Sequence, residues 1–359
     1  MNPCPIDYPG LGPVGQVFPA RPTDDSLSSF PSPIQARLLP VIAHHPSFPS
    51  RFALGLLAGG LLLSGSAAAD ETCPSVAKTA VKKAPVAATS NRANGATTTV
   101  YDFKTLKIHA YTAPKQALRT SSYVIEGPHK LVVIEPQFMN SLSKDFRAYV
   151  DSLGKPIDRV LVTDRDPDHY FGLATGFTDV PAYALPSVIS VIDKEGPALL
   201  EERRKVFGEE MPKQQLVPGH ALNTGKETID CVHYQFDAST DDEGGQQATI
   251  RLPDYGVIAT GDIASNRCHI VPGKATEQRL KAYAKNAKAY SLVLPANGLP
   301  SDSQLFKTNL AYLKKVKANL KVAKTAEAYQ KLMTTAYPDY DCEIYFMFYV
   351  PAHYQPKKN

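Results

Sequence analysis

Residues 157–172 read IDRVLVTDRDPDHYFG, an apolar run that ends abruptly in charged residues. The stretch from Asp158 to Thr163 is short and mostly apolar, which is typical of a buried strand. Loops at the carboxyl ends of such strands are where α/β proteins carry their functional groups. The sequence therefore predicts a site in the loop that follows, and its first candidates are Asp164, Asp166, Asp168 and His169.

The three carboxylates of this loop stand at alternate positions and repel one another. Close acids either raise one another's pKa or gather round a cation, because carboxylate oxygens are ligands for hard divalent ions. The alternative is a solvated acidic loop in which Arg165 is the local partner. The loop by itself leaves both interpretations open.

The flanking sequence predicts strands first and then strands that alternate with helices. Before the loop, β-branched and aromatic runs separated by turn residues indicate a meander of strands. A helix should follow them and end at Gly154. The predicted strands cover residues 98–103, 106–113, 121–127 and 130–136, and the helix covers residues 142–153.

After the loop a second set of elements follows in a similar order. Helices are predicted at residues 186–207, 275–290 and 303–336, and strands at residues 229–236, 247–252, 257–260 and 291–295. Two sheets that meet face to face with helices outside them form a four-layer α/β/β/α sandwich. We expect one such domain over residues 98–359, with a helical and aromatic C-terminal extension. The stretch from Asp341 could be a final strand, a lid or an interface, and packing inside the fold is the default.

Across residues 98–336 the sequence resembles the metallo-β-lactamase-fold hydrolases. In that family a strand ends in T-H-x-H-x-D-H-x-x-G, and VTDRDPDHYFG occupies the same context here. The residues that match are Asp168, His169 and Gly172. The resemblance implies the four-layer sandwich of that family.

Three flanking segments carry the same resemblance. SSYVIEGPHKLVVIEPQ resembles the family's first hairpin and has Glu135 where an aspartate usually ends the strand. LPDYGVIATGD resembles the strand that ends in a metal-bridging aspartate, here Asp262. VLPANGLP resembles the V-x-P-G-H-G turn, with Asn297 at the histidine position.

The resemblance implies a divalent-metal site with an altered ligand set. The second metal position of the family keeps Asp168, His169 and Asp262, whereas the first position offers only carboxylates. Oxygen ligands suit manganese, magnesium or calcium better than zinc, so the identity of the ion and the choice between one ion and two stay open. The candidate metal ligands are Asp164, Asp166, Asp168, His169, Glu243 and Asp262.

Three of these residues have expected roles besides ligation. Asp168 would orient a metal-activated water or return a proton to the leaving group, which makes it the catalytic candidate. Asn297 could donate a hydrogen bond to a small-molecule substrate. His269 could line the pocket, and a structural histidine is the alternative.

Two functions of different classes are consistent with these residues. The first is an exported hydrolase in which metal-activated water opens an ester, lactone, amide or thioester. The second is a catalytically inactive, metal-poor scaffold that binds a ligand or partner in the periplasm. We expect the first, because Asp168, His169 and Asp262 are present together.

The N-terminal third of the sequence predicts export. Residues 1–50 hold eleven of the 30 prolines and no hydrophobic period, so they are interpreted as a leader upstream of a misassigned start. Residues 51–69 are typical of a signal peptide, with a short apolar run and a small-residue cleavage site. Residues 70–97 are predicted to be a flexible linker. We expect a periplasmic or secreted protein without a stable membrane anchor after cleavage.

The net charge argues against a nucleic-acid partner, and the cysteine content leaves disulfide pairing open. The formal net charge of +4 over 359 residues is too small for a nucleic-acid footprint, so no nucleic-acid partner is expected. Four cysteines follow the signal, and they could pair or be small buried residues.

Overall fold

The computed structural model describes Cys73 and residues 84–240, 245–270 and 273–354. The predicted leader, the signal peptide and the ligand candidate Glu243 lie outside these ranges. The described residues belong to one compact unit. No described helix combines the length and the apolar character that a membrane span requires.

An eight-stranded sheet carries the N-terminal half of the fold. Its strands follow one another in chain order, antiparallel from β1 to β5 and parallel from β5 to β8. The centre of the sheet is buried on both faces, which explains the continuous apolar run before the acidic loop. The strands are β1 (Ala87–Asn91), β2 (Thr97–Asp102), β3 (Lys107–Thr112), β4 (Ser121–Glu126), β5 (Leu131–Ile134), β6 (Ile157–Leu161), β7 (Ala182–Ala184) and β8 (His220–Ala221).

A five-stranded sheet carries the other half, in the order β13-β12-β11-β10-β9. Only the β12–β13 pair in it is parallel. The chain therefore brings the ends of β12 and β13 to the same edge of this sheet. Its strands are β9 (Gly225–Ile229), β10 (Val232–Thr240), β11 (Gln246–Leu252), β12 (Val257–Ser265) and β13 (Leu292–Asn297).

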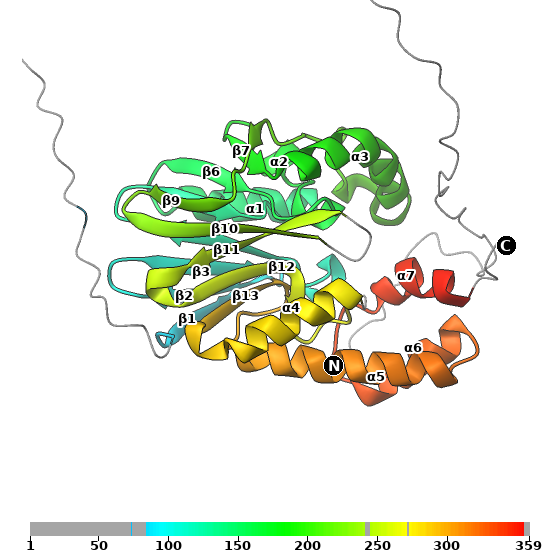
Figure 1. Cartoon of the computed structure of the whole chain (residues 1–359). Coiled ribbons are helices and arrows are strands. Elements are labelled where there is room, and N and C mark those ends of the chain that lie inside the picture. The colour runs from blue at the N-terminus through cyan, green and yellow to red at the C-terminus, as the bar shows by residue number, and fades with distance from the viewer. Residues whose placement is uncertain (1–72, 74–83, 241–244, 271–272, 355–359) are drawn as a thin grey trace, which may run out of the picture. The chain divides into compact units, whose positions relative to one another are not determined.

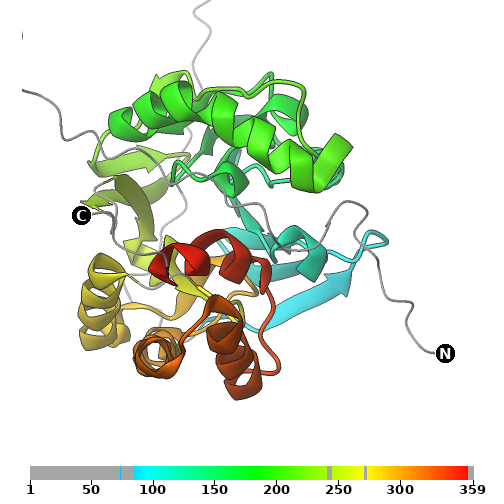
Figure 2. The same cartoon turned by 90° about the vertical axis from the view of Figure 1, so that its right-hand side faces the viewer.

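Helices lie outside the two sheets on opposite sides (Figure 1), and the view turned by 90° shows the same separation (Figure 2). One core cluster joins both sheets with α1 and α3, and a second packs β12 and β13 against α4 to α7. The predicted α/β/β/α sandwich is thus confirmed. The helices are α1 (Asn140–Asp151), α2 (Leu173–Gly176), α3 (Pro186–Phe207), α4 (Lys274–Lys285), α5 (Gln304–Val322), α6 (Ala326–Ala336) and α7 (Ile344–Tyr354).

Two predicted elements are interrupted by local turns. The strand expected at residues 229–236 breaks at Asp230 and Cys231, which both have positive φ. The helix expected at residues 303–336 breaks before α6, where the Thr325 hydroxyl accepts a hydrogen bond from the Ala328 amide at 3.1 Å. A threonine cap of this kind starts a new helix, because it satisfies an amide that has no partner in the first turn.

The predicted flexible linker is wrong over its described C-terminal part. Strand β1 lies within it and pairs with β2 from Ala87 to Asn91. Cys73 is also bonded to Cys231, 158 positions away, so this end of the linker is tied to the second sheet. Cys268 and Cys342 form a second disulfide. The sequence left this pairing open.

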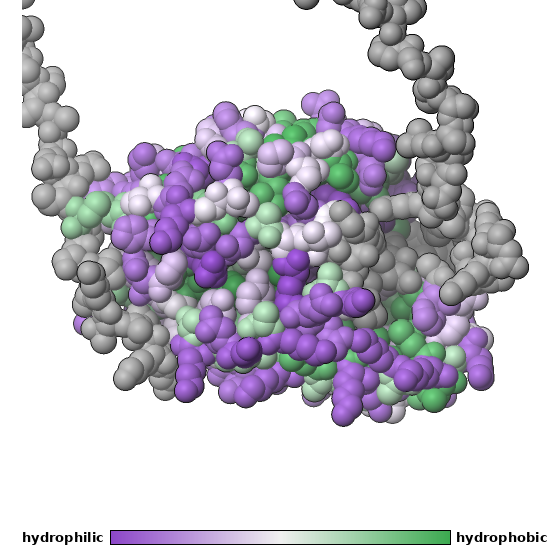
Figure 3. Space-filling model, viewed as in Figure 1, coloured by the Kyte–Doolittle hydropathy of each residue, from purple (hydrophilic) through white to green (hydrophobic). Residues whose placement is uncertain are grey.

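The surface over α4 and α5 is mostly hydrophilic (Figure 3). Apolar side chains are exposed at the end of α5, where Val322 is 62% exposed, and within α6, where Leu332 is 38% exposed. The C-terminal aromatic stretch is not a strand. It forms α7, and Phe346 of that helix is buried in the second core cluster.

Candidate functional site

The acidic loop after β6 is held by its own backbone and by close contact with the segment after β5. The Asp164 carboxylate accepts hydrogen bonds from the amides of Arg165 at 2.6 Å and Asp166 at 3.2 Å. At Gly172 an added Cβ would lie 2.1 Å from the Pro136 carbonyl oxygen, so no larger residue fits there. The glycine of the motif therefore has a packing role.

Most of the predicted site residues converge. Charge interactions link Asp164, Asp166, Asp168 and His169 of the loop with Asp262 of β12. We call these five residues and Glu135, which contacts His169, the acid cluster. The sequence noted Glu135 as the end of a strand but did not include it among the site residues.

At the centre of the acid cluster, His169 lies between two carboxylates. Its Nδ1 is 3.1 Å from Oε1 of Glu135, and its Nε2 is 3.2 Å from Oδ1 of Asp262. The side chains of His169 and Glu135 are 2% and 3% exposed, whereas that of Asp262 is 38% exposed. Oε1 of Glu135 also accepts hydrogen bonds from the amide and the hydroxyl of Thr163. The imidazole is thus fixed from both sides.

These contacts favour the charged form of the imidazole. Burial by itself lowers the pKa of His169, but the charges of Asp262 and Glu135 outweigh it and hold that pKa well above its ordinary value. Nε2 of His169 is close enough to Oδ1 of Asp262 for an ion pair, but the two groups are not aligned for a hydrogen bond. Nε2 of His169 and Oε2 of Glu135 have no hydrogen-bond partner among the described residues.

The three aspartates of the loop bind protons more tightly than usual. Burial, followed by the charge of Asp166, raises the pKa of Asp164 well above its ordinary value. Burial and the charges of Asp262 and Asp168 raise the pKa of Asp166 to about 7. Burial also raises the pKa of Asp168, and the charge of Asp262 acts in the same direction, against that of His169. Burial and mutual repulsion thus disfavour the ionised form of all three carboxyl groups.

Asn297 lies at the end of β13 and is linked to the cluster through a residue that the sequence did not single out. Its Nδ2 donates to the Leu118 carbonyl at 2.9 Å and to the Tyr345 hydroxyl at 3.3 Å. The Tyr345 hydroxyl in turn donates to Oδ2 of Asp168 at 3.3 Å. Both amide hydrogens of Asn297 are therefore used inside the protein, which argues against its predicted role as a donor to substrate.

The predicted substrate-binding role of His269 is wrong. This side chain is fully buried, and its Nδ1 lies 2.8 Å from the Tyr312 hydroxyl. The rings of Tyr340 and Phe346 pack on it, and burial lowers its pKa to about 4. The structural alternative holds for this histidine.

In the described residues the donor atoms are not arranged to hold a metal ion. No group of three or more His, Cys, Asp and Glu residues in the described ranges is arranged to hold one. The geometry gives the reason, because the Asp164 carboxylate turns back onto its own loop and the ring nitrogens of His169 face two carboxylates. The ligand roles predicted for these residues therefore remain predictions.

Comparison with known proteins gives similarity in structure only. No family model and no curated protein matches the sequence. A metallo-beta-lactamase from Pontibacter korlensis is 10% identical, with a TM-score of 0.46 over 64% of this chain and 99% of that chain. The metallo-beta-lactamase FIM-1 from Pseudomonas aeruginosa in the mono-zinc form is 12% identical, with a TM-score of 0.45 over 65% and 97%.

A stereoselective inverting sec-alkylsulfatase from Pseudomonas sp. is also similar, at 18% identity and a TM-score of 0.45. The match covers 62% of this chain and 42% of the sulfatase chain. These similarities concern the structure alone.

Proposed function

We propose that this protein uses the acid cluster to bind a small organic cation, without hydrolytic turnover, on a scaffold of hydrolase type. One observation carries the proposal: the histidine that would ligate a metal is paired instead with Glu135 and Asp262. A protonated imidazole between two carboxylates supplies part of the positive charge that a metal would otherwise bring.

The charge balance of the cluster supports a cationic ligand. Five carboxylates meet one imidazole, and the nearby guanidinium groups of Arg165 and Arg203 only partly offset the raised pKa values of Asp166 and Asp168. In the absence of ligand these two carboxyl groups bind protons more tightly than usual. A cation that approaches the partly exposed Asp262 would favour the ionised carboxylates, so its affinity should increase from pH 5 to pH 8.

A metal-dependent hydrolase is the second candidate. It is favoured by the buried Nε2 of His169 and Oε2 of Glu135, which lack hydrogen-bond partners among the described residues. Buried polar atoms are seldom left in this state, and an ion is one way to satisfy them. On this alternative, the protein would open an ester, lactone, amide or thioester.

Calorimetry on protein produced from the full-length sequence distinguishes the two candidates. We expect 1,4-diaminobutane or guanidinium to bind with one-to-one stoichiometry, more tightly at pH 8 than at pH 5. Asp262→Asn should weaken this binding, and Asp254→Asn is the matched control because Asp254 pairs with His233 on the surface. Binding of neither cation, or hydrolysis of ester and lactone panels on addition of zinc or manganese, would overturn the proposal.

We also propose that the protein is exported, as the signal-like residues 51–69 predict. Two disulfides that join distant segments support an oxidising compartment. Fractionation followed by N-terminal sequencing should recover a chain that begins at Asp70 outside the cytoplasm. A cytoplasmic chain with intact residues 51–69 would contradict export.

A further inference from the structure

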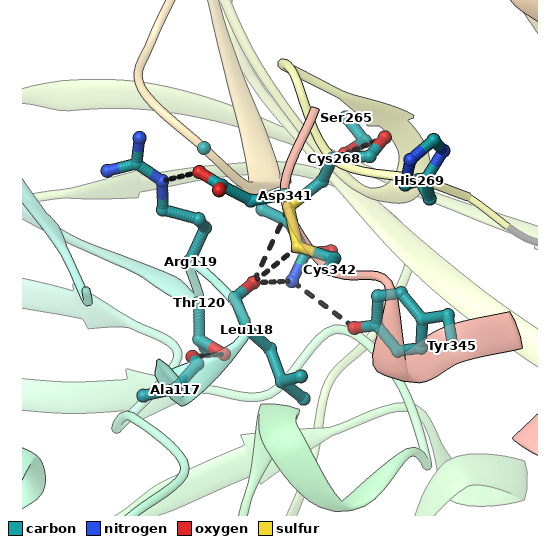
Figure 4. Close-up of a disulfide and its surroundings, with 12 residues drawn as sticks. Ala117, Leu118, Arg119, Thr120, Ser265, Cys268, His269, Asp341, Cys342 and Tyr345 are labelled. Atoms are coloured by element: carbon teal, nitrogen blue, oxygen red, sulfur yellow. Dashed lines mark hydrogen bonds and ion pairs between the residues drawn. A yellow bond between two sulfur atoms is a disulfide. The ribbon is translucent and has the colours of Figure 1, made fainter. Parts of the chain in front are cut away.

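The segment that leads into α7 is anchored by contacts from two other parts of the chain, and Figure 4 shows the disulfide in this region with its surroundings. The Asp341 amide donates to the Arg267 carbonyl at 2.8 Å, and the His269 amide donates to the Asp341 carbonyl at 2.9 Å. The Arg119 guanidinium pairs with the Asp341 carboxylate at 2.8 Å. The start of this segment is therefore fixed before α7 begins at Ile344.

A disulfide completes this anchor. Cys342 is bonded to Cys268, which lies just beyond β12, and both cysteines are buried. The sulfur of Cys342 lies 3.2 Å from the Leu118 carbonyl oxygen, and the amide of Asn297 donates to that same oxygen. The disulfide and Asn297 thus both contact the carbonyl oxygen of Leu118, which lies beside Cys342 in Figure 4.

Three residues after Cys342, Tyr345 reaches the cluster. Its hydroxyl accepts a hydrogen bond from Asn297 and donates one to Asp168, each at 3.3 Å. A donor to one carboxylate oxygen limits the rotation of the carboxyl group. Asp168 is therefore oriented by a side chain that lies 177 positions away in the sequence.

We propose that Tyr345 is a positioning residue of the acid cluster and that the Cys268–Cys342 disulfide holds it there. The inference rests on the proposed function only in taking the acid cluster as the site. Tyr345 orients Asp168, and the bonded cysteines keep the start of α7 close enough for its hydroxyl to make both hydrogen bonds.

Hydrogen–deuterium exchange on the full chain tests this role without any ligand. The amides of His169, Tyr170 and Phe171 bond to carbonyls of the same loop, so they report on its order. In Tyr345→Phe we expect their exchange to rise roughly three- to tenfold at an unchanged melting temperature, as the loss of the hydrogen bond to Asp168 allows. Tyr340→Phe is the control, since its ring packs against Tyr312 in the second core.

The two disulfides provide a second matched comparison. Cys268→Ala/Cys342→Ala should reproduce the faster exchange at residues 169–171, whereas Cys73→Ala/Cys231→Ala should leave it unchanged. Faster exchange confined to residues 342–354 in both Tyr345→Phe and the first cysteine pair would overturn the proposal, because the segment would then have only a structural role. If the Cys268→Ala/Cys342→Ala variant does not fold, the exchange measured in Tyr345→Phe tests the positioning role by itself. This test of Tyr345 does not depend on whether the acid cluster binds a cation.

Discussion

The imidazole of His169 is held between the carboxylates of Glu135 and Asp262, 3.1 Å from the first and 3.2 Å from the second. One end of this arrangement is buried and the other reaches solvent, because only Asp262 is appreciably exposed. Both ring nitrogens of His169 are thus close to carboxylates of the protein itself. Stability, pH response and ligand preference should all depend on this contact.

Removal of the imidazole should destabilise the fold strongly. In His169→Ala the carboxylate of Glu135 stays buried without its cationic partner, and a broken buried pair costs about 3–5 kcal/mol. Urea denaturation should show this loss, and Glu135→Gln in the same background should recover part of it. His233→Gln is the control, because His233 pairs with Asp254 at the surface and should change stability by less than about 1 kcal/mol. Equal losses in both variants would contradict the account.

The raised pKa of Asp166 sets the sign of the pH dependence. Its carboxyl binds a proton more tightly in the folded protein, with a pKa of about 7, than in the unfolded chain. Its contribution to the free energy of unfolding therefore falls as the pH rises from about 4 through 7, by at most about 1.4 kcal/mol per pH unit. His169 acts in the same direction: its stabilisation is complete below the unfolded pKa and is lost as the pH rises through the raised folded pKa.

Asp166→Asn should remove the pH-dependent contribution of Asp166 to the free energy of unfolding. We expect the gain in stability over the wild type to increase between pH 5 and pH 8, as measured by urea denaturation at each pH. The substitution Asp179→Asn should show no such trend, because Asp179 is exposed and pairs with Arg147, whose guanidinium keeps its charge over this pH range. A gain that is the same at both pH values would mean that Asp166 does not titrate in this range.

Gly172 should tolerate no side chain. A Cβ there would meet the carbonyl oxygens of Pro136 at 2.1 Å and Gln137 at 2.4 Å, so the acidic loop would have to move. We expect Gly172→Ala to lower the free energy of unfolding by about 2 kcal/mol or more. Gly219→Ala is the matched control, because nothing lies within 4 Å of its added Cβ. Thermal melts of the two variants should differ clearly, and similar melting temperatures would contradict the packing role.

The disulfide between Cys73 and Cys231 should stabilise the fold by constraining the unfolded chain. It closes a loop of 158 residues, for which chain entropy predicts roughly 4–5 kcal/mol. Cys73→Ala/Cys231→Ala should lower the urea midpoint accordingly. No change in that midpoint would show that the bond is absent or adds nothing.

The spacing of apolar residues predicted the architecture, because apolar residues recur at the positions that a helix or strand buries. The predicted helix at residues 186–207 coincides with α3, and the apolar run before the acidic loop is β6. The break between α5 and α6 escaped prediction, because the helical period continues through Thr325 while a local cap ends it. Residues of the predicted linker form β1, since a short edge strand has little apolar signal of its own.

The loop residues that the motif singled out lie close together, but the motif could not predict their orientation. The motif match identifies the type of residue at position 169. The pairing of His169 with Glu135 depends instead on how β5 and β6 lie side by side. Tyr345 had no local signal, because a distant disulfide brings it to the cluster. The sequence left His269 between a pocket role and a structural role, because its proximity to Asp262 in sequence did not reveal the aromatic rings around it.

Metal titration with proton counting tests the central claim most directly. Full-length protein that has been treated with chelator is titrated with zinc, manganese, magnesium and calcium in a calorimeter at pH 7, and bound metal is then measured by elemental analysis. The paired imidazole predicts no stoichiometric binding of any of the four ions and no change in melting temperature. One bound equivalent that raises the melting temperature, releases protons and is lost in both His169→Ala and Asp262→Ala would contradict the account.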